Sequence, residues 1–338
     1  MIKLFSDKGK YLSTFNKKGR GSGEYINMAT FRIEPMDGSI NVIDEMGKVY
    51  KYDSDFNFVK LIPLVDEKIF FSGEGFHLLD NNRYLITKSS IQLTDPASGV
   101  TNEVILYDDS AKIHFKIGFV QKNDIHSHSE GGKVISLSYA NFPYYISRFK
   151  NLFTLITPIK DTIYSLNNNG KLSLRYTINY GKYSRPIDKN IFSFENTILI
   201  NNFIVFKPPL FESNDFIFFE FNMGSFCRNP IERVSRFGKS EFKYRETEEY
   251  AIFSKKTGKL TFLDLPEDGK RGMVEDIKNG PPFWPQFTGT NGEFISYMTA
   301  LDFLALAEKP EAKPGIISEV AAKIKEDDNP VIIISYPK

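Results

Sequence analysis

Two histidines separated by one residue are the strongest candidates for catalytic chemistry in this sequence. His126 and His128 flank a serine, and on a β-strand residues at i and i+2 place their side chains on the same face. Two imidazoles on one face suit zinc or another transition metal, which needs at least one more ligand. The candidates for that ligand are His77, His114, Asp124 and Glu130. The surroundings, rich in acidic residues, serine and glycine, favour an exposed polar loop instead, so we expect no cofactor.

Aromatic side chains form a second group of candidates, for binding without catalysis. Trp284 lies between a phenylalanine and a proline, and Tyr144 and Tyr145 end the segment Asn141–Tyr145. Their rings could form platforms for a sugar or a peptide. Aromatic residues in a chain rich in β-strands more often belong to the core, and both interpretations stay open at this point.

The segment Gly19–Tyr25 contains three glycines and resembles a phosphate-binding loop only superficially. It lacks the Gly-Lys-Ser/Thr ending, and it precedes a strand pattern, so no helix N-terminus would face an anion. We therefore expect a tight connection between strands. Arg20 and Glu24 could still line the mouth of a β-sheet blade and contact a ligand.

Other catalytic and metal motifs are incomplete. There is no Gly-x-Ser-x-Gly motif, and the four histidines are too scattered to support a Ser/His/Asp triad. The acidic pairs Asp44–Glu45, Glu248–Glu249 and Asp327–Asp328 are adjacent, so on a strand their side chains point to opposite faces. Asp53 begins a segment like a calcium loop, but Phe and Leu stand where Gly and Glu are needed.

A recurring hairpin pattern indicates which elements must hold these candidate residues. A short apolar run, a turn of Asp, Asn, Ser or Gly, and a second alternating run recur at apolar anchors 5, 52, 107, 166 and 253. Such turn residues favour hairpins. The spacing of the first four anchors is about that of one four-stranded propeller blade. Five hairpins and one modified terminal blade predict a single all-β domain over residues 1–338, a six-bladed β-propeller of four-stranded antiparallel blades with an incomplete first blade.

The expected strands and insertions follow from the same alternation. The first complete blade is predicted at 28–34, 39–44, 48–53 and 57–64, and a closing strand at 331–336. Long insertions are expected at 141–157, 228–248 and 301–329. The last of these is helical, because Ile316, Val320 and Ile324 share one face of a helix predicted over 316–326.

Composition excludes several classes of function. Lys plus Arg total 43 and Asp plus Glu total 42, a balance that gives no electrostatic footprint for nucleic acid. No apolar run is long enough for a transmembrane helix, and no signal peptide follows Met1. Cys227 is the one cysteine, so an internal disulfide is impossible and a buried thiol is the simplest interpretation.

Four stretches resemble a six-bladed β-propeller family, related to NHL-repeat proteins, of gut-dwelling Gram-negative bacteria. They are Gly19–Tyr25, Asp161–Tyr164, Tyr176–Gly181 and Glu326–Ile332, and the similarity spans nearly the whole chain. Ser22 stands where that family usually carries proline. The resemblance implies a periplasmic or cell-surface protein, often lipid-anchored, and brings no catalytic residues.

Together these observations predict a non-enzymatic scaffold that binds an unknown glycan, peptide or protein, with a metal-dependent hydrolase or lyase acting through His126 and His128 as the alternative. The N-terminal hairpin lacks the two inner strands that the other blades have. An open blade leaves unpaired backbone groups. We therefore expect the natural protein to carry a longer N-terminal segment with those strands and an export signal. A cytoplasmic propeller of five and a half blades is the other possibility.

Overall fold

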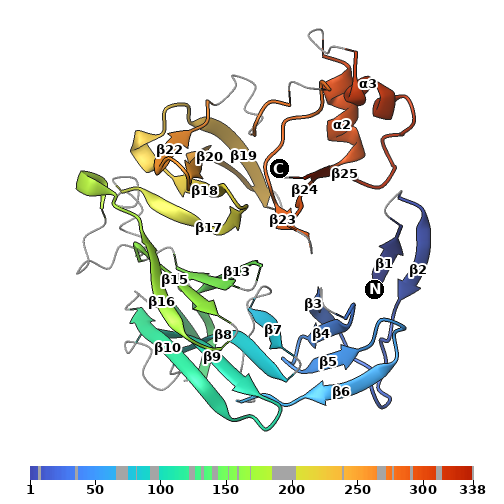
Figure 1. Ribbon diagram of the computed structural model, residues 1–338, viewed down its shortest axis with the longest axis vertical. Coiled ribbons are helices and arrows are strands. Elements are labelled where there is room, and N and C mark those ends of the chain that lie inside the picture. Colours follow the sequence, from blue (N-terminus) through green and yellow to red (C-terminus); the bar gives the residue numbers. More distant parts are fainter. Residues whose placement is uncertain are drawn as a thin grey trace. The chain divides into compact units, whose positions relative to one another are not determined.

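Antiparallel β-strands dominate the computed structural model (Figure 1). It describes residues 1–6, 9–34, 37–65, 75–80, 82–91, 99–121, 126–130, 133–138, 144–150, 152–157, 160–167, 169–184, 203–237, 240–264, 272–275, 278–289, 292–309 and 314–336.

In the described part of the chain, four sheets have four antiparallel strands each, and we call them the first to fourth blades. The first blade is β3 (Met28–Ile33), β4 (Ile40–Asp44), β5 (Val49–Tyr52) and β6 (Phe58–Ile62). The second is β7 (Phe76–Asp80), β8 (Arg83–Ile91), β9 (Val100–Asp108) and β10 (Ile113–Gln121). The third is β13 (Tyr145–Phe149), β14 (Leu152–Ile156), β15 (Thr162–Asn167) and β16 (Leu172–Thr177). The fourth is β17 (Val205–Glu212), β18 (Phe216–Asn222), β21 (Glu248–Ser254) and β22 (Lys259–Phe262).

The remaining sheets are smaller. A fifth blade has three strands, β23 (Phe287–Thr288), β24 (Phe294–Met298) and β25 (Val331–Ser335). Three two-stranded sheets pair β1 (Ile2–Phe5) with β2 (Tyr11–Phe15), β11 (His126–Glu130) with β12 (Lys133–Ser138), and β19 (Ile231–Phe237) with β20 (Ser240–Glu246).

The fold class is thus the expected β-propeller with antiparallel four-stranded blades, but the count of six blades is wrong. The described residues form five blades. The sequence count treated the β1–β2 hairpin as a blade of its own, whereas this hairpin has only two strands. Ile2 and Phe15 from it join the buried cluster on one face of the first blade, with Tyr25, Val42 and Tyr52.

The recurring turns are closed by Asp and Asn side chains that bond the backbone, as the turn residues predicted. The carboxylate of Asp53 accepts hydrogen bonds from the backbone N–H of Asp55 and Asn57, at 3.0 and 2.8 Å. Asp108 and Asn167 make the same two bonds, to the residues two and four positions later. These side chains therefore close the turns β5–β6, β9–β10 and β15–β16, in each case between the third and fourth strands of a blade.

The described chain divides into two compact units, each with its own buried clusters. The first unit comprises 1–146, 151–177 and 192–194, and the second comprises 147–150, 178–191 and 195–338. In the first unit, apolar side chains fill the space between the first and second blades and between the second and third. In the second unit, the corresponding cluster includes Phe218 from the fourth blade and Phe294 from the fifth.

Two predicted segments differ from the structure. The expected insertion 141–157 contains β13 and β14, the first two strands of the third blade. The helix expected over 316–326 is shorter: α3 spans Ile316–Ala321 and buries no side chain completely. It lies beside α2 (Ala300–Ala307), which buries Phe303 and Leu306, and both helices fall between β24 and β25 as predicted.

Candidate functional site

A hairpin formed by β19 and β20 projects from the fourth blade, and we call it the hairpin arm. It interrupts that blade between β18 and β21, in the region where an exposed insertion was predicted. Val234 and Tyr244 are 54% and 52% exposed. The Arg233 side chain is 45% exposed and that of Arg245 69%. The arm thus offers an aromatic ring, a branched aliphatic side chain and two guanidinium groups to solvent.

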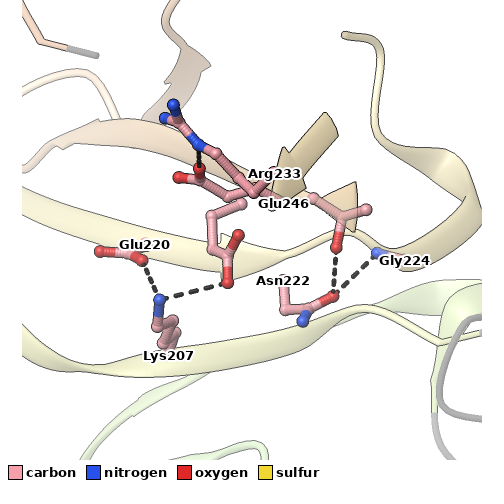
Figure 2. Close-up of polar contacts among 8 residues, drawn as sticks. Lys207, Glu220, Asn222, Gly224, Arg233 and Glu246 are labelled. Carbon is pink, nitrogen blue, oxygen red and sulfur yellow. Dashed lines mark hydrogen bonds and ion pairs between the residues drawn. The ribbon is translucent and has the colours of Figure 1, made fainter. Parts of the chain in front are cut away.

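The base of the arm is fixed by Asn222, the last residue of β18. Its side-chain oxygen accepts hydrogen bonds from the backbone N–H of Gly224 at 2.9 Å and from the Thr247 hydroxyl at 3.1 Å (Figure 2). Gly224 lies just after the chain leaves the blade, and Thr247 just before it returns. The Asn222 amide therefore links the residue at which the chain enters the arm to the residue at which it leaves the arm. Beside it, the Met223 N–H donates to the Thr247 carbonyl at 2.9 Å.

A charged network lies next to this base. The Lys207 ammonium reaches the carboxylates of Glu220 at 2.8 Å and Glu248 at 3.2 Å, and Arg233 meets Glu246 at 2.6 Å (Figure 2). Burial alone lowers the pKa of Lys207, but the hydrogen bonds and negative charges of Glu220 and Glu248 outweigh it and raise the pKa above its ordinary value. Lys207 therefore carries its charge throughout the physiological range and holds Glu248, the first residue of β21, in place.

A second ion pair anchors the arm from its entry side. Glu249 is 1% exposed and accepts hydrogen bonds from the backbone N–H and the Nε of Arg228, at 2.6 and 2.7 Å. The Arg228 guanidinium also donates to the Leu263 carbonyl at 2.6 Å. Because an isolated two-stranded hairpin is only marginally stable in water, these contacts explain how the arm keeps a defined direction.

The glycine-rich segment forms the tight connection that was expected. The Glu24 carboxylate accepts a hydrogen bond from the Gly21 N–H at 2.7 Å, and the Gly19 N–H donates to the Tyr25 carbonyl at 3.0 Å. Arg20 is exposed. The Gly21 N–H, which a bound anion would need as a donor, is thus already bonded to Glu24. A ligand role for Arg20 and Glu24 stays a prediction.

The aromatic candidates lie in separate places. Tyr144 is 2% exposed and belongs to the cluster between the second and third blades, and Tyr145 is half-buried at the start of β13. Trp284 is 8% exposed, in the second unit, with one face against the ring of Tyr250. Among these, Tyr144 has a feature of special interest, because its buried hydroxyl has no hydrogen-bond partner.

The histidine pair lies on a strand, as the i, i+2 argument required. His126 and His128 belong to β11 and pair with Ser138 and Ser136 of β12; their side chains lie outside the described part of the structure. Of the possible third ligands, His77 packs edge-on against Phe153 and His114 contacts Asp108 at 2.7 Å. Asp124 and the Glu130 side chain are not described. No group of three potential metal ligands occurs among the described residues.

Comparison with protein families decides the classification. The profile of a domain of unknown function, DUF4934, matches residues 1–336. The chain belongs to the DUF4934 family. No curated protein matches this DUF4934 sequence at a significant level. In the described ranges of this family member, no helix has the length and apolar character needed to cross a membrane.

A solved structure shares the fold of this DUF4934 protein. A crystal structure from Bacteroides fragilis NCTC 9343, described as a candidate exported protein, superposes with a TM-score of 0.60 at 15% identity, covering 99% of this chain and 84% of that chain. This similarity shows the fold alone. A Synechocystis apocarotenoid oxygenase variant gives a TM-score of 0.27 at 9% identity, over 76% of this chain and 54% of that one. That score is too low to support any inference.

The sequence of the DUF4934 protein indicated where the arm lies, but not the side-chain contacts that fix its base. The polar stretch from Arg228 to Glu248 predicted an exposed insertion at this place. Asn222, Lys207 and Glu249 carry no local signal, because each sits inside an ordinary strand pattern and meets its partners only through strand pairing.

Proposed function

We propose that this DUF4934 protein is an exported, non-enzymatic scaffold and that the hairpin arm is its contact surface for a protein partner. The observation that carries the proposal is an exposed two-stranded arm rooted in a rigid blade by Asn222, Lys207 and Arg228. Binding segments of proteins are typically loops or hairpins held by such a scaffold.

The composition of the arm supports a protein as the partner. Tyrosine and arginine are enriched in the energetically important centres of protein interfaces. The arm exposes Tyr244 beside Arg233 on one face, and Val234 and Arg245 on the other. The register places Arg233 opposite Tyr244 and Val234 opposite Lys243, so each exposed apolar side chain has a cation as its cross-strand neighbour.

The export part of the proposal is supported by two similarities. The Bacteroides fragilis structure is described as a candidate exported protein, and the sequence resembles an exported propeller family. A relation to NHL repeats and a lipid anchor are part of the same proposal. Fractionation of cells of the encoding organism tests it: we expect the native protein in the envelope or outside the cell, and a purely cytoplasmic location would contradict export.

Site-specific photocrosslinking in those cells tests the arm. A benzophenone amino acid at position 244 should give a defined adduct with one protein. The matched control is position 11, because Tyr11 is 53% exposed and also lies on a two-stranded hairpin. Adducts of equal yield at both positions, or none at position 244, would contradict the proposal.

Purified components provide the second measurement. With the crosslinked protein in hand, the double substitution Val234→Ser and Tyr244→Ser should weaken binding about thirtyfold or more, as expected for central interface residues. A glycan or peptide that binds this protein but is unaffected by these substitutions would instead assign recognition to another surface.

The alternative function, a metal-dependent hydrolase or lyase, is favoured by one observation, the placement of His126 and His128 two residues apart on β11. Elemental analysis of protein purified without chelators tests it. A stoichiometric metal that is lost from the His126→Ala variant would support the enzyme over the scaffold.

A further inference from the structure

Two buried hydrogen-bond donors without a partner and one ammonium group lie around Phe119 in the first unit, at the junction of the second and third blades. They are the side-chain amide of Asn102, the hydroxyl of Tyr144 and the ammonium of Lys160. None of them takes part in the hairpin arm, which belongs to the second unit.

Strand register places the first donor. Ser89, Asn102 and Phe119 are cross-strand neighbours on β8, β9 and β10, so their side chains share one face of the second blade. Asn102 is completely buried, and its oxygen accepts a hydrogen bond from the Ser89 hydroxyl at 2.6 Å. That bond fixes the amide, and the Nδ2 group is buried with no acceptor.

Phe119 connects this amide to the other two donors. The ring of Tyr144 meets that of Phe119 edge-on, with centroids 5.3 Å apart, and the Lys160 ammonium lies 4.9 Å from the centroid of the same Phe119 ring. The Tyr144 hydroxyl is buried without a partner. Burial, followed by the charge of Tyr164, raises the pKa of Tyr144 to about 12, so its hydroxyl keeps its proton and can donate.

Lys160 completes the set with a positive charge. No carboxylate among the described residues pairs with its ammonium, which lies over the Phe119 ring. Phe119 and Lys160 are both half-buried, whereas Asn102 and Tyr144 are buried. Since β10 is an edge strand of its blade, the donors extend from the interior to a partly exposed rim.

The junction of the first and second blades provides a contrast. It also contains a buried tyrosine hydroxyl without a partner, on Tyr107, and a buried asparagine, Asn41, but the unpaired atom of Asn41 is its oxygen. Its ammonium groups are already neutralised: Lys51 meets Asp37 at 3.5 Å and Lys60 meets Asp109 at 2.6 Å. Of the two junctions, the one around Phe119 therefore combines a lysine without an ion-pair partner with unpaired groups that are all hydrogen-bond donors.

We propose that Asn102, Tyr144 and Lys160 form a binding site for a carboxylate group, seated against the edge of Phe119. A carboxylate accepts several hydrogen bonds, and its negative charge can pair with the Lys160 ammonium. Leaving buried donors unpaired destabilises a fold, and an acceptor supplied by a ligand removes that cost. The carboxylate belongs either to a free small acid or to the C-terminus of a peptide.

Calorimetry on the full-length protein with sodium acetate tests the site. Acetamide, which has the same shape without the charge, is the ligand control. We expect saturable binding of acetate in the millimolar range, as a few charge-assisted hydrogen bonds would give, and at least tenfold weaker binding of acetamide. A short peptide with a free C-terminus, compared with its C-terminal amide, distinguishes the two sources: tighter binding than acetate identifies a peptide, and equal binding a free acid.

Variants tie the binding to the named donors. Tyr144→Phe and Lys160→Gln should each weaken acetate binding about tenfold. Tyr107→Phe is the matched control, because it removes an equally buried, unpaired hydroxyl at the other junction, and it should leave binding unchanged. Absence of saturable binding, equal binding of acetamide, or equal losses in Tyr144→Phe and Tyr107→Phe would overturn the proposal and leave ordered water as the acceptor for these donors.

Discussion

The indole ring of Trp284 lies flat on the phenol ring of Tyr250, with centroids 4.3 Å and planes 5° apart. Phe218 approaches the indole edge-on at 5.6 Å. These rings belong to the cluster that joins the fourth blade to the fifth. Stacked and edge-on aromatic pairs stabilise a core beyond the area that they bury, so this pair is a main link within the second unit.

Replacing Tyr250 by alanine should lower the free energy of unfolding by about 2–4 kcal/mol, because it removes the stacked ring and leaves a cavity. Trp284 is the single tryptophan of the chain, so tryptophan fluorescence reports on the surroundings of this one ring and should shift to longer wavelength in the variant. The control is Tyr297→Ala, which removes a ring that is 48% exposed and should cost less than about 1 kcal/mol. Unchanged tryptophan emission in Tyr250→Ala would contradict the prediction.

The pair of Arg228 and Glu249 should be far more important for stability than other ion pairs near the arm. Replacing Arg228 by alanine leaves the buried Glu249 carboxylate without its guanidinium partner, at a cost of about 2–4 kcal/mol. The matched control is Arg245→Ala, since Arg245 and Glu232 are both 69% exposed and such pairs contribute about 0–1 kcal/mol. Urea denaturation measures both. Equal effects of the two substitutions would mean that the burial of Glu249 is not important.

Acid should remove a stabilising contact between the first two blades. Burial by itself raises the pKa of Asp109, but hydrogen bonds from Lys60 and Tyr84 and the Lys60 charge outweigh it and hold the pKa below the ordinary 3.8. A carboxyl with a lowered pKa in the folded state stabilises the fold above its unfolded pKa, and this contribution disappears as pH falls through the folded value.

Thermal melts of the wild type and of Asp109→Asn from pH 7 to about pH 2 measure this contribution. Asp109 is about one-third exposed, so we expect the variant to melt only about 1–2 °C lower between pH 5 and pH 7. The difference should begin to shrink as the pH falls below about 4, and it should vanish only below the lowered pKa of Asp109, where the wild-type carboxyl is protonated as well. A difference that stays constant down to about pH 2 would assign the effect to packing.

Local turn chemistry explains what was predictable from the sequence. Asp53, Asp108 and Asn167 bond their own backbone, so each marked a hairpin without any knowledge of its neighbours. Alternation then gave the strands of the first blade to within two residues. The segment 141–157 was misread because β14 is buried at nearly every position and so does not alternate.

Features that depend on distant partners were not predictable. Asn102 and Lys160 are 58 positions apart in the numbering and are brought to one aromatic ring only by blade packing. The one local signal was a polar residue, Asn102, at an inward position of β9 between Val100 and Val104. Tyr144 was selected for its ring, whereas the structure draws attention to its hydroxyl.

The two short helices near the C-terminus should differ sharply in importance. The sequence placed Val320 on the apolar face of a predicted helix, but α3 buries no side chain completely, whereas Phe303 on α2 is 1% exposed. Phe303→Ala should therefore lower the free energy of unfolding by about 3–5 kcal/mol through the cavity it leaves. Val320→Asp places a charge on a half-buried surface and should cost only about 1 kcal/mol. Chemical denaturation of both variants decides the matter, and a larger loss for Val320→Asp would mean that α3 docks more tightly in solution than its exposure indicates.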